Sequence, residues 1–496
     1  MATYNSAFVK GIMSDNPWWA DDALNKIIFS ELPTFTRSDY DYYISELYKN
    51  KVCVLLGPRR CGKSTLIKQI IRHLLFEKNA NPKRILYVSL ERAFYDLTDK
   101  KIRDILEFYQ ETILKKNIYE LKEKIYLFID EAHYDSSWPR IFKQFVELNL
   151  PIYAIISGSS APALYKDEES GAGRFSRNQM VTLKFRDVAR YLNREHDDKI
   201  KIISKELREA LLESFQTKNP TTYVKKVQEV VSLNPWLENS MKAALQEYLL
   251  KGGYPEFYSG VKNKSWTEIS RYYQTNVFDL ILQKDVVAIS NIRQPEKIRK
   301  LLVFLVQNTS RQLGREKITR HLGFKSQITV DQYIDALSEA FLIRTASRFK
   351  KGKGYPSTKA KKYYSADPGL RNSVLGLDLA DLSTEEKGGL IETAVFNHSL
   401  RLLFNIDREI RQSGFYYEKS GEVVSERDIV LASSKLDSPI PLEVKNGSCG
   451  LEDEKKMRAT ISDLKSSFGI ITCNDQIGLK NEKIVVIPSW VFLLSC

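Results

Sequence analysis

The stretch "LLGPRRCGKST", residues 55–65, decides the fold of the first part of this 496-residue chain. It satisfies the phosphate-loop pattern G-x-x-x-x-G-K-[ST], in which glycines let successive backbone N–H groups point at phosphate oxygens. Lys63 would reach the β- and γ-phosphates, and the Ser64 hydroxyl would ligate Mg²⁺. The sequence therefore predicts a site for ATP and Mg²⁺, and its nucleotide-binding residues are Gly57, Pro58, Arg59, Arg60, Cys61, Gly62, Lys63, Ser64 and Thr65.

The flanks of this loop predict a strand before it and a helix after it. "VCVLL" (52–56) is a short apolar run typical of a buried strand, and 64–76 places its apolar residues on one helical face. Further apolar segments at 84–90, 125–129 and 151–160, the last with a polar end, alternate with helical patterns. This alternation indicates an α/β fold with a parallel sheet.

An acidic pair follows the third of these predicted strands, in "KIYLFIDEAHYDSSW" (124–138). We expect Asp130 to hold Mg²⁺ through water and Glu131 to polarise the attacking water as a general base. Because a P-loop precedes the pair, the sequence favours ATP hydrolysis over nucleotide binding alone.

Composition describes an ordinary globular protein of two to four domains, with 43% hydrophobic and 28% charged residues. The start of the chain lacks a signal-peptide pattern, and its longest apolar runs are too short to span a bilayer. Five scattered cysteines without a CxxC pair argue against a disulfide or zinc framework. We therefore expect a cytoplasmic protein without a membrane partner.

Positive charge is concentrated between residues 293 and 362, where 17 Lys or Arg face 5 Asp or Glu, while the whole chain carries +13. Three helical patterns, at 296–308, 314–323 and 326–343, precede a basic strand–loop–strand, which is the order of a winged helix. The third helix would carry Gln327, Thr329 and Gln332 towards a groove, and the loop 350–362 would lie along phosphates as the wing. DNA is favoured over RNA because a helix suits the B-form major groove. A packing module with a solvated basic loop is the alternative.

The chain resembles a large group of prokaryotic ATPases from about Trp18 to its end. The resemblance rests on "GPRRCGKST", "LFIDEAH", "IISGSSAPAL", "GAGR" and "YLLKGGYPE", which occur in the order found in that group. In these proteins an AAA-type domain is joined to a C-terminal domain of unknown function that looks like the restriction-endonuclease fold.

The resemblance implies two further residues of the ATPase site. In AAA-type ATPases a polar residue at the end of the strand beside the P-loop senses the γ-phosphate, and here Ser157 is the first choice and Ser159 the second. Helix capping by these serines is the alternative. An arginine after the sensor strand corresponds to Arg174, which would neutralise transition-state charge in cis or from a neighbouring subunit. A surface arginine without a role is equally compatible with the sequence.

The resemblance also implies a nuclease-like site in the C-terminal part. Restriction-type nucleases bring together a helix Glu, a strand Asp and a Glu-x-Lys on the next strand. The matching residues are Glu392, Asp428, Glu443 and Lys445, and alternation places Glu443 and Lys445 on one face of their strand. Asp428 and Glu443 would hold Mg²⁺, Glu392 would assist, and Lys445 would orient or activate water. Relatives commonly show Glu-Val-Asp where this chain has Arg427 before Asp428, which disturbs the alternation of that strand.

We therefore expect four parts: an AAA-type core (1–185), a helical lid (186–285), a basic winged helix (286–362) and a restriction-endonuclease-like domain (363–496). Three functions are compatible with them, and the chain could form a homo-oligomer in each. The first is an ATP-dependent enzyme acting on DNA, with a metal-dependent nuclease activity. The second is an ATP-switched DNA-binding regulator or scaffold that does not cut. The third is a protein-remodelling ATPase.

Overall fold

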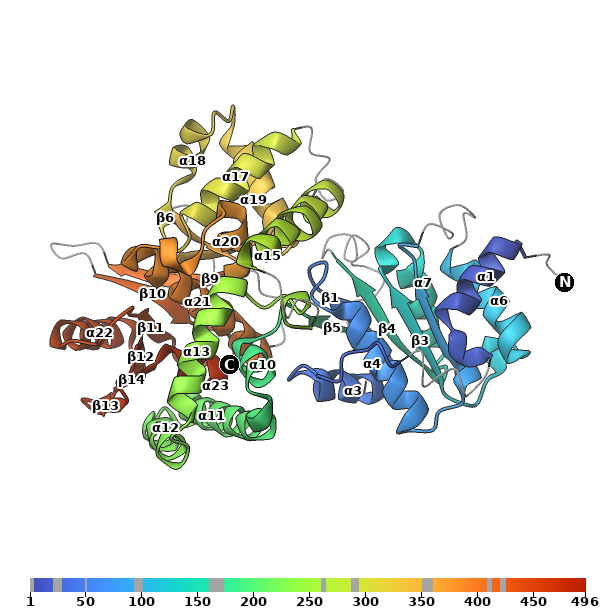
Figure 1. Ribbon diagram of the computed structural model, residues 1–496, viewed down its shortest axis with the longest axis horizontal. Helices are drawn as coiled ribbons and strands as arrows, with labels where there is room; N and C mark the ends of the chain where they lie inside the picture. Colours follow the sequence, from blue (N-terminus) through green and yellow to red (C-terminus); the bar gives the residue numbers. More distant parts are fainter. Residues whose placement is uncertain are drawn as a thin grey trace. The chain divides into compact units, whose positions relative to one another are not determined.

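The computed structural model divides the chain into two compact units, Met1–Val181 and Thr182–Cys496 (Figure 1). The four-part division expected from the sequence stays a prediction. The structure describes residues 4–20, 29–49, 51–92, 101–159, 174–259, 265–286, 294–349, 360–407, 413–419 and 425–496.

The first unit is built on a five-stranded parallel sheet with the order β2-β3-β4-β1-β5. All residues of β1 and β3 are buried, as expected for central parallel strands that are covered on both faces. The strands predicted at 52–56, 84–90 and 125–129 are confirmed, and the strand predicted at 151–160 is present but ends at Gly158. The strands are β1 (Val52–Leu56), β2 (Ile85–Ser89), β3 (Ile125–Asp130), β4 (Ile152–Gly158) and β5 (Ser176–Gln179).

Strand order places the P-loop strand β1 beside β4, which in turn lies beside the acidic strand β3. Because all five strands are parallel, the loops that follow them meet at one edge of the sheet. The main helices of this unit are α1 (Ser6–Asp15), α3 (Tyr40–Lys49), α4 (Lys63–Phe76), α6 (Ile102–Phe108) and α7 (Trp138–Glu147).

Side chains from the N-terminal segment cover the outer edge of this sheet. Helix α1 contacts β2, which is one of the two edge strands. The Asn16 amide donates to the Tyr87 carbonyl and accepts from the Tyr87 N–H, both at 2.7 Å. The indole N–H groups of Trp18 and Trp19 donate to the Ile85 carbonyl at 3.0 and 2.9 Å. These side chains take the place of a neighbouring strand along β2.

The second unit begins with helices and ends with a mixed α/β segment. The described residues between 185 and 259 are mainly helical, and the lid predicted over 186–285 stays a prediction. Helix α13 packs on α20, α21 and α23 from the last part of the chain, and α11 packs on α23. The helices are α10 (Phe185–Leu192), α11 (Asp197–Thr217), α12 (Thr221–Leu233), α13 (Leu237–Lys251), α14 (Glu256–Ser259), α15 (Trp266–Tyr273), α17 (Pro295–Gln307), α18 (Arg315–His321), α19 (Gln327–Glu339), α20 (Pro368–Leu375), α21 (Thr384–Ile406), α22 (Leu451–Leu464) and α23 (Ser489–Ser495).

A nine-stranded sheet runs through this unit in the order β13-β14-β12-β11-β10-β9-β7-β8-β6. Strands β6, β8 and β7 form an antiparallel group, and β7 pairs in parallel with β9. Strands β9, β10 and β11 form an antiparallel meander, while β11, β12 and β14 are parallel. The strands are β6 (Gln312–Leu313), β7 (Ile343–Arg348), β8 (Lys361–Ser365), β9 (Ser413–Lys419), β10 (Ser425–Leu431), β11 (Ile440–Val444), β12 (Gly469–Cys473), β13 (Gly478–Lys480) and β14 (Ile484–Pro488).

The β9–β10 pairing contains a bulge at the predicted disturbance. Arg427 faces Tyr417 and Val430 faces Phe415, so two residues of β10 oppose one of β9. The bulge re-aims the side chains of Asp428 and its neighbours relative to a regular strand.

A buried carboxylate, Asp367, ties three distant segments of the second unit together. It accepts hydrogen bonds from the Thr182 hydroxyl at 3.0 Å and from the Gly253 N–H at 2.8 Å. Gly252 has a φ of 72°, and a Cβ on it would lie 1.7 Å from the Asp367 Oδ1. The "KGGYPE" turn after α13 therefore requires glycine, for backbone conformation and for space.

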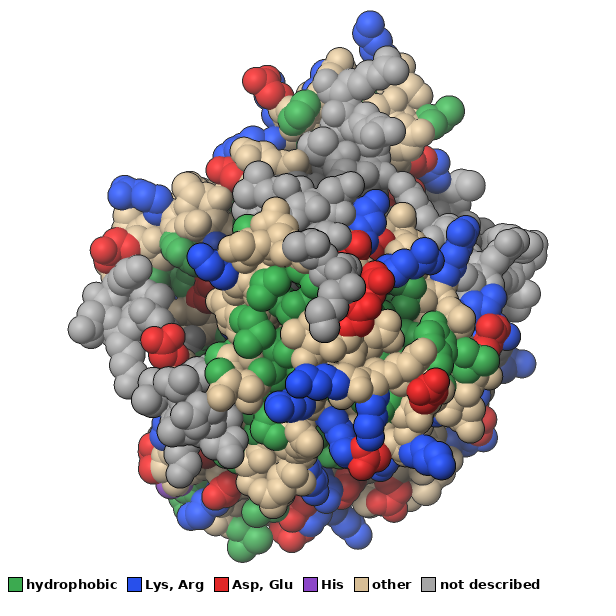
Figure 2. All heavy atoms as spheres, turned by 90° about the vertical axis from the view of Figure 1, so that its right-hand side faces the viewer, with side chains coloured by type: hydrophobic (Ala, Val, Ile, Leu, Met, Phe, Trp, Pro, Cys, Tyr) green, Lys and Arg blue, Asp and Glu red, His purple; other side chains and the backbone are tan. Residues whose placement is uncertain are grey.

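None of the helices that the structure describes is long and apolar enough to cross a membrane. On the face of the molecule drawn in Figure 2, Lys and Arg side chains are interspersed with Asp and Glu. No patch of one sign dominates that face.

Candidate functional site

The P-loop curls between β1 and α4 in a conformation that depends on its glycines. Gly62 caps α4 with a φ of 98° and offers no side chain to the N–H groups of the first turn. A Cβ on Gly57 would lie 1.8 Å from the Met180 carbonyl oxygen, so only glycine allows this approach to the chain after β5. The N–H groups of this turn and the helix dipole favour an anion at this point.

Lys63 lies at the start of α4 and is buried within the loop. Its Nζ donates to the carbonyls of Gly57 at 2.9 Å and Pro58 at 3.1 Å, and lies 3.6 Å from Glu131. The ammonium is therefore held inside the P-loop by backbone carbonyls that a phosphate could replace.

Asp130 and Ser157 meet at the ends of β3 and β4. The Ser157 hydroxyl donates to Asp130 Oδ1, and the Tyr87 hydroxyl donates to Asp130 Oδ2 at 3.3 Å. Burial raises the pKa of Asp130, and the charge of Glu131 adds to this, while hydrogen bonds from Ser157 and Ser64 oppose it. The structure thus brings Ser64, Asp130 and Ser157 to one place.

Glu131 follows β3 in a left-handed conformation, with a φ of 53°. Its N–H donates to the Ser157 hydroxyl at 3.3 Å, and its Oε2 accepts from the Ser159 N–H at 3.1 Å. Burial alone would raise the pKa of Glu131, but Lys63, His133 and Arg59 outweigh it and lower the pKa to about 2. Glu131 is therefore ionised at neutral pH, and Ser159 holds it through its backbone.

Sequence reasoning missed three residues around this site. The buried Arg37 donates to the carbonyls of Cys61 and Val181, at 3.3 and 3.0 Å, and supports the loop from outside the motif. Tyr87 contacts Asp130, and His133 lies 3.2 Å from Glu131. His133 stands within the acidic motif and could have been proposed, but no pattern in the sequence identifies Arg37 or Tyr87.

Two of the three arginines predicted near phosphate, Arg59 and Arg174, are engaged in ion pairs. Arg59 is buried and lies 2.6 Å from Glu91. Arg174 lies 3.1 Å from Glu147, and both side chains are more than 40% exposed. The rest of the predicted "GAGR" segment, residues 171–173, lies outside the described part of the chain.

This arrangement fits ATP and Mg²⁺. The uncapped N-terminus of α4 and Lys63 suit the phosphates, and Ser64 with Asp130 offers the oxygen ligands that Mg²⁺ prefers. Glu131 lies next to this point with its carboxylate ionised.

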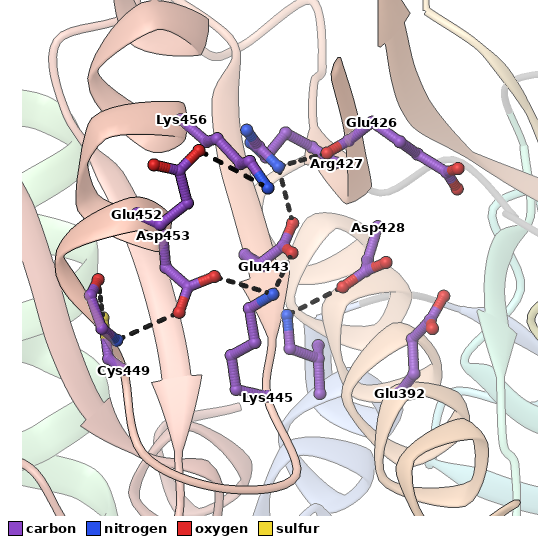
Figure 3. Close-up of polar contacts among 12 residues, drawn as sticks. Glu392, Glu426, Arg427, Asp428, Glu443, Lys445, Cys449, Glu452, Asp453 and Lys456 are labelled. Carbon is purple, nitrogen blue, oxygen red and sulfur yellow. Dashed lines mark hydrogen bonds and ion pairs between the residues drawn. The ribbon is translucent and has the colours of Figure 1, made fainter. Parts of the chain in front are cut away.

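The predicted C-terminal site also converges, at the bulged β10 and the end of β11. Asp428 lies between Glu392 of α21 and Glu443 of β11, with Lys445 beside them (Figure 3). Lys445 is the first residue after β11, and its Nζ lies 2.9 Å from Glu443 Oε1. The Val444 N–H donates to Asp428 Oδ2 at 2.9 Å, so β11 also fixes Asp428.

Mutual repulsion and burial perturb these carboxyl groups. Burial, followed by the charge of Asp428, raises the pKa of Glu392 to about 8 and also raises the pKa of Glu443. Tyr364 donates to Glu392 Oε1 at 2.8 Å.

The position of Lys362 differs from the one that the sequence predicted. The sequence places it in a DNA-contacting wing, but its side chain on β8 is only 3% exposed. Its Nζ lies 3.2 Å from Glu392, 2.7 Å from Glu426 and 3.3 Å from Asp428. A buried ammonium requires such partners, so packing among the carboxylates decides its position. The rest of the predicted wing, 350–359, lies outside the described residues.

The residues of this cluster do not fit a divalent metal. Lys362 contacts Glu392 and Asp428, while Arg427 lies 3.2 Å and Lys445 2.9 Å from Glu443. In the part of the chain that the structure describes, no group of three or more His, Cys, Asp or Glu side chains could hold a metal ion. The internal cations already neutralise the oxygens that Mg²⁺ would need.

Comparison with known proteins assigns two segments to families. Residues 49–189 match the family model described as "AAA domain", and residues 242–381 match "Domain of unknown function (DUF8612)". An uncharacterized protein of Haemophilus influenzae is 26% identical over 395 residues, which cover 77% of this chain and 84% of that protein.

Solved structures resemble this chain only distantly. The Walker-type ATPase PABY2304 of Pyrococcus abyssi is 15% identical, with a TM-score of 0.37 over 70% of this chain and 99% of that one. The Bacillus subtilis DNA clamp loader delta protein is 10% identical, with a TM-score of 0.23 over 60% of this chain and 86% of that one.

The family match, together with the P-loop, supports ATP hydrolysis, and the segment 49–189 is an AAA-type domain joined to a domain of unknown function.

Proposed function

We propose that this protein is an ATP-hydrolysing AAA-type ATPase that acts on DNA and carries a nuclease-like domain which does not cut. The observation that carries the ATPase proposal is the meeting of Lys63, Asp130, Glu131 and Ser157 at the ends of β1, β3 and β4. The DNA and nuclease-like parts rest on strand order and charge in the second unit.

The P-loop geometry suggests how binding prepares hydrolysis. ATP would draw the Lys63 ammonium away from the Gly57 and Pro58 carbonyls and onto phosphate. Lys63 is also the largest influence that lowers the pKa of Glu131. Neutralisation of Lys63 by phosphate therefore makes Glu131 a stronger base, at the moment when it must polarise water.

Ser157 and Arg174 would complete the site. Ser157 bridges Asp130 and the Glu131 backbone, so it is positioned to respond to the metal and the attacking water together. The exposed pair between Arg174 and Glu147 is weak enough to open, which would free the arginine for a γ-phosphate in cis or in a second subunit.

The order of elements supports a winged helix in the second unit. The elements follow one another in the chain order α17, β6, α18, α19, β7 and β8. In the sheet, β8 lies between β7 and β6. On the predicted recognition helix α19, Gln327 and Gln332 are exposed and Thr329 is half-buried. The excess of Lys and Arg over 293–362 supports DNA as the partner.

The order of elements also supports a restriction-endonuclease-like fold. Helix α21, the meander β9-β10-β11, helix α22 and the strand β12 parallel to β11 follow in sequence around the acidic cluster. The convergence of Glu392, Asp428, Glu443 and Lys445 favours this fold, whereas the ion pairs of Lys362 and Arg427 favour binding without cleavage. We therefore place the regulator or scaffold ahead of the nuclease.

ATP turnover measured with and without duplex DNA, together with plasmid incubated with Mg²⁺ and ATP, tests the proposal. We expect DNA to stimulate hydrolysis and the plasmid to stay intact. Plasmid nicking that disappears in Asp428→Asn would establish the nuclease instead. Equal ATP turnover with and without DNA would favour an acidic protein partner. The absence of ATP turnover would refute the proposed ATPase activity.

A further inference from the structure

Lys362 saturates the acidic cluster around Asp428. An ammonium group has three N–H donors, and Nζ has three carboxylates within reach, Glu426 at 2.7 Å, Glu392 at 3.2 Å and Asp428 at 3.3 Å. The three carboxylates come from α21 and β10, whereas Lys362 comes from β8. The contact is therefore tertiary and depends on where β8 lies.

Local backbone pairing holds Lys362 in this place. Lys362 pairs with Gln312 of β6 on one side and with Ala346 of β7 on the other. The next strand beyond β7 is β9, followed by β10, which carries Glu426 and Asp428. The lysine thus reaches along the sheet from the three-stranded group with α17, α18 and α19 to the nuclease-like meander.

The remaining carboxylate of the predicted site is compensated separately. Glu443 lies 3.2 Å from Arg427 and 2.9 Å from Lys445, and Lys445 also lies 3.0 Å from Asp453. Removal of Lys362 alone would therefore leave Glu443 paired and uncover Glu392, Glu426 and Asp428.

We infer that the Lys362 ammonium is the resident cation of this cluster and keeps Glu392, Glu426 and Asp428 closed to divalent metal. This inference rests on the nuclease-like part of the proposed function and is independent of the ATPase part. The Lys362 ammonium takes the place that a divalent ion would have. The carboxylate oxygens, which suit Mg²⁺ or Mn²⁺, become available only when this ammonium is removed.

Thermal unfolding of the nucleotide-free, full-length protein in Mn²⁺ tests the inference. Lys362→Met keeps an apolar stem of similar length but removes the charge, so the buried carboxylates repel one another and Tm falls. We expect Mn²⁺ to restore the Tm of Lys362→Met and to bind it at least about tenfold more tightly than wild type. The double variant Lys362→Met, Asp428→Asn should lose this rescue.

Lys361→Met is the matched control, because Lys361 is the preceding residue of β8, is less buried and forms none of the ion pairs described for Lys362. Its Mn²⁺ response should equal that of wild type.

Equal Mn²⁺ responses in Lys362→Met and wild type would overturn the inference. If Lys362→Met does not fold, the inference is tested by comparing wild type with Asp428→Asn. The Mn²⁺ responses of these two proteins should be the same, because Lys362 keeps Mn²⁺ away from Asp428 in wild type. Mn²⁺ binding by wild type that Asp428→Asn abolishes would show that the lysine does not close the site. ATP turnover plays no part in these outcomes, so they are separable from the ATPase proposal.

Discussion

Lys63 and Glu131 balance charge at the P-loop, and we expect Lys63 to exchange its present partners for phosphate when ATP binds. Lys63 contacts two backbone carbonyls and lies 3.6 Å from Glu131, which is itself held by the Ser159 N–H. Because Glu131 keeps its position through the backbone of β4's end, loss of its contact with Lys63 alters its basicity more than its geometry.

The first prediction separates phosphate binding from water activation. Lys63→Ala should weaken ATP binding about 10- to 100-fold, since a hydrogen bond to a charged group contributes roughly 1.5–3 kcal/mol. Glu131→Gln should still bind ATP but hydrolyse it about 10²- to 10⁴-fold more slowly, as expected for loss of a general base. Fluorescent-nucleotide titration and phosphate release measure the two effects. Glu123→Gln, at a more exposed acidic residue of the same unit, is the control, and equal turnover in Glu131→Gln and wild type would contradict the assignment.

The two serines at the end of β4, Ser157 within the strand and Ser159 just after it, should behave differently. Ser157 contributes its hydroxyl to Asp130 and Glu131, whereas Ser159 holds Glu131 through its backbone N–H. Ser157→Ala should therefore lower kcat and cost about 1–3 kcal/mol of unfolding free energy, because buried polar groups lose a partner. Ser159→Ala keeps the N–H and should leave kcat close to that of wild type. A larger loss of kcat in Ser159→Ala than in Ser157→Ala would reverse the choice of sensor.

Glu392 predicts a dependence of stability on pH. Its pKa is raised from 4.5 to about 8, first by burial and then by Asp428. Between these two values the folded protein keeps a proton that the unfolded chain has lost, so stability falls as pH rises through this window. The Tm of Glu392→Gln relative to wild type should therefore be higher at pH 9 than at pH 5. Glu385→Gln, at an exposed residue of the same helix, should show no such trend. A difference in Tm that is the same at both pH values would argue against a raised pKa.

At the scale of elements, the sequence predicted those strands and motifs that depend on a single continuous segment of the chain. The strands β1 and β3 are continuous apolar runs because both faces of a parallel sheet are covered, and the acidic residues come directly after such a run. The contacts of Lys362 could not be predicted, since its partners Glu392 and Asp428 are 30 and 66 residues away and the preceding residue, Lys361, is equally basic. Arg37 was missed for the same reason, because it supports the P-loop from a segment without a motif.

The turn after α13 allows a prediction at this scale. In Gly252→Ala the new Cβ meets the Asp367 carboxylate, and the backbone, with a φ of 72° and a ψ of −155°, lies in a region that is almost restricted to glycine. We therefore expect a loss of more than about 4 kcal/mol in unfolding free energy. Gly376→Ala is the control for a positive φ alone, since its φ of 67° and ψ of 29° are left-handed helical and no atom lies within 4 Å of the added Cβ. It should lose only about 1–2 kcal/mol. Denaturant unfolding measures both, and equal losses would show that the Asp367 contact is not tight.

At the scale of the whole molecule, the basic region has to be separated from the buried lysine within it. Neutralising Lys350, Lys351, Lys353 and Lys361 together should weaken DNA binding for all sequences and flatten its salt dependence, by about 0.9 for each lost phosphate contact. Lys362 is left out because it is buried among carboxylates. Fluorescence anisotropy over a range of salt concentrations measures the slope. An unchanged slope would move the DNA contact elsewhere, or remove it from the function.

The side chains that cover β2 also determine whether a truncated form of the protein would stay in solution. An exposed edge strand offers its backbone to any other extended chain, and this invites aggregation. Asn16, Trp18 and Trp19 occupy that backbone with side-chain donors and an acceptor. A shortened version of the protein that starts just before the P-loop would keep every nucleotide-binding residue and still tend to precipitate, because β2 would become an open template for its own copies.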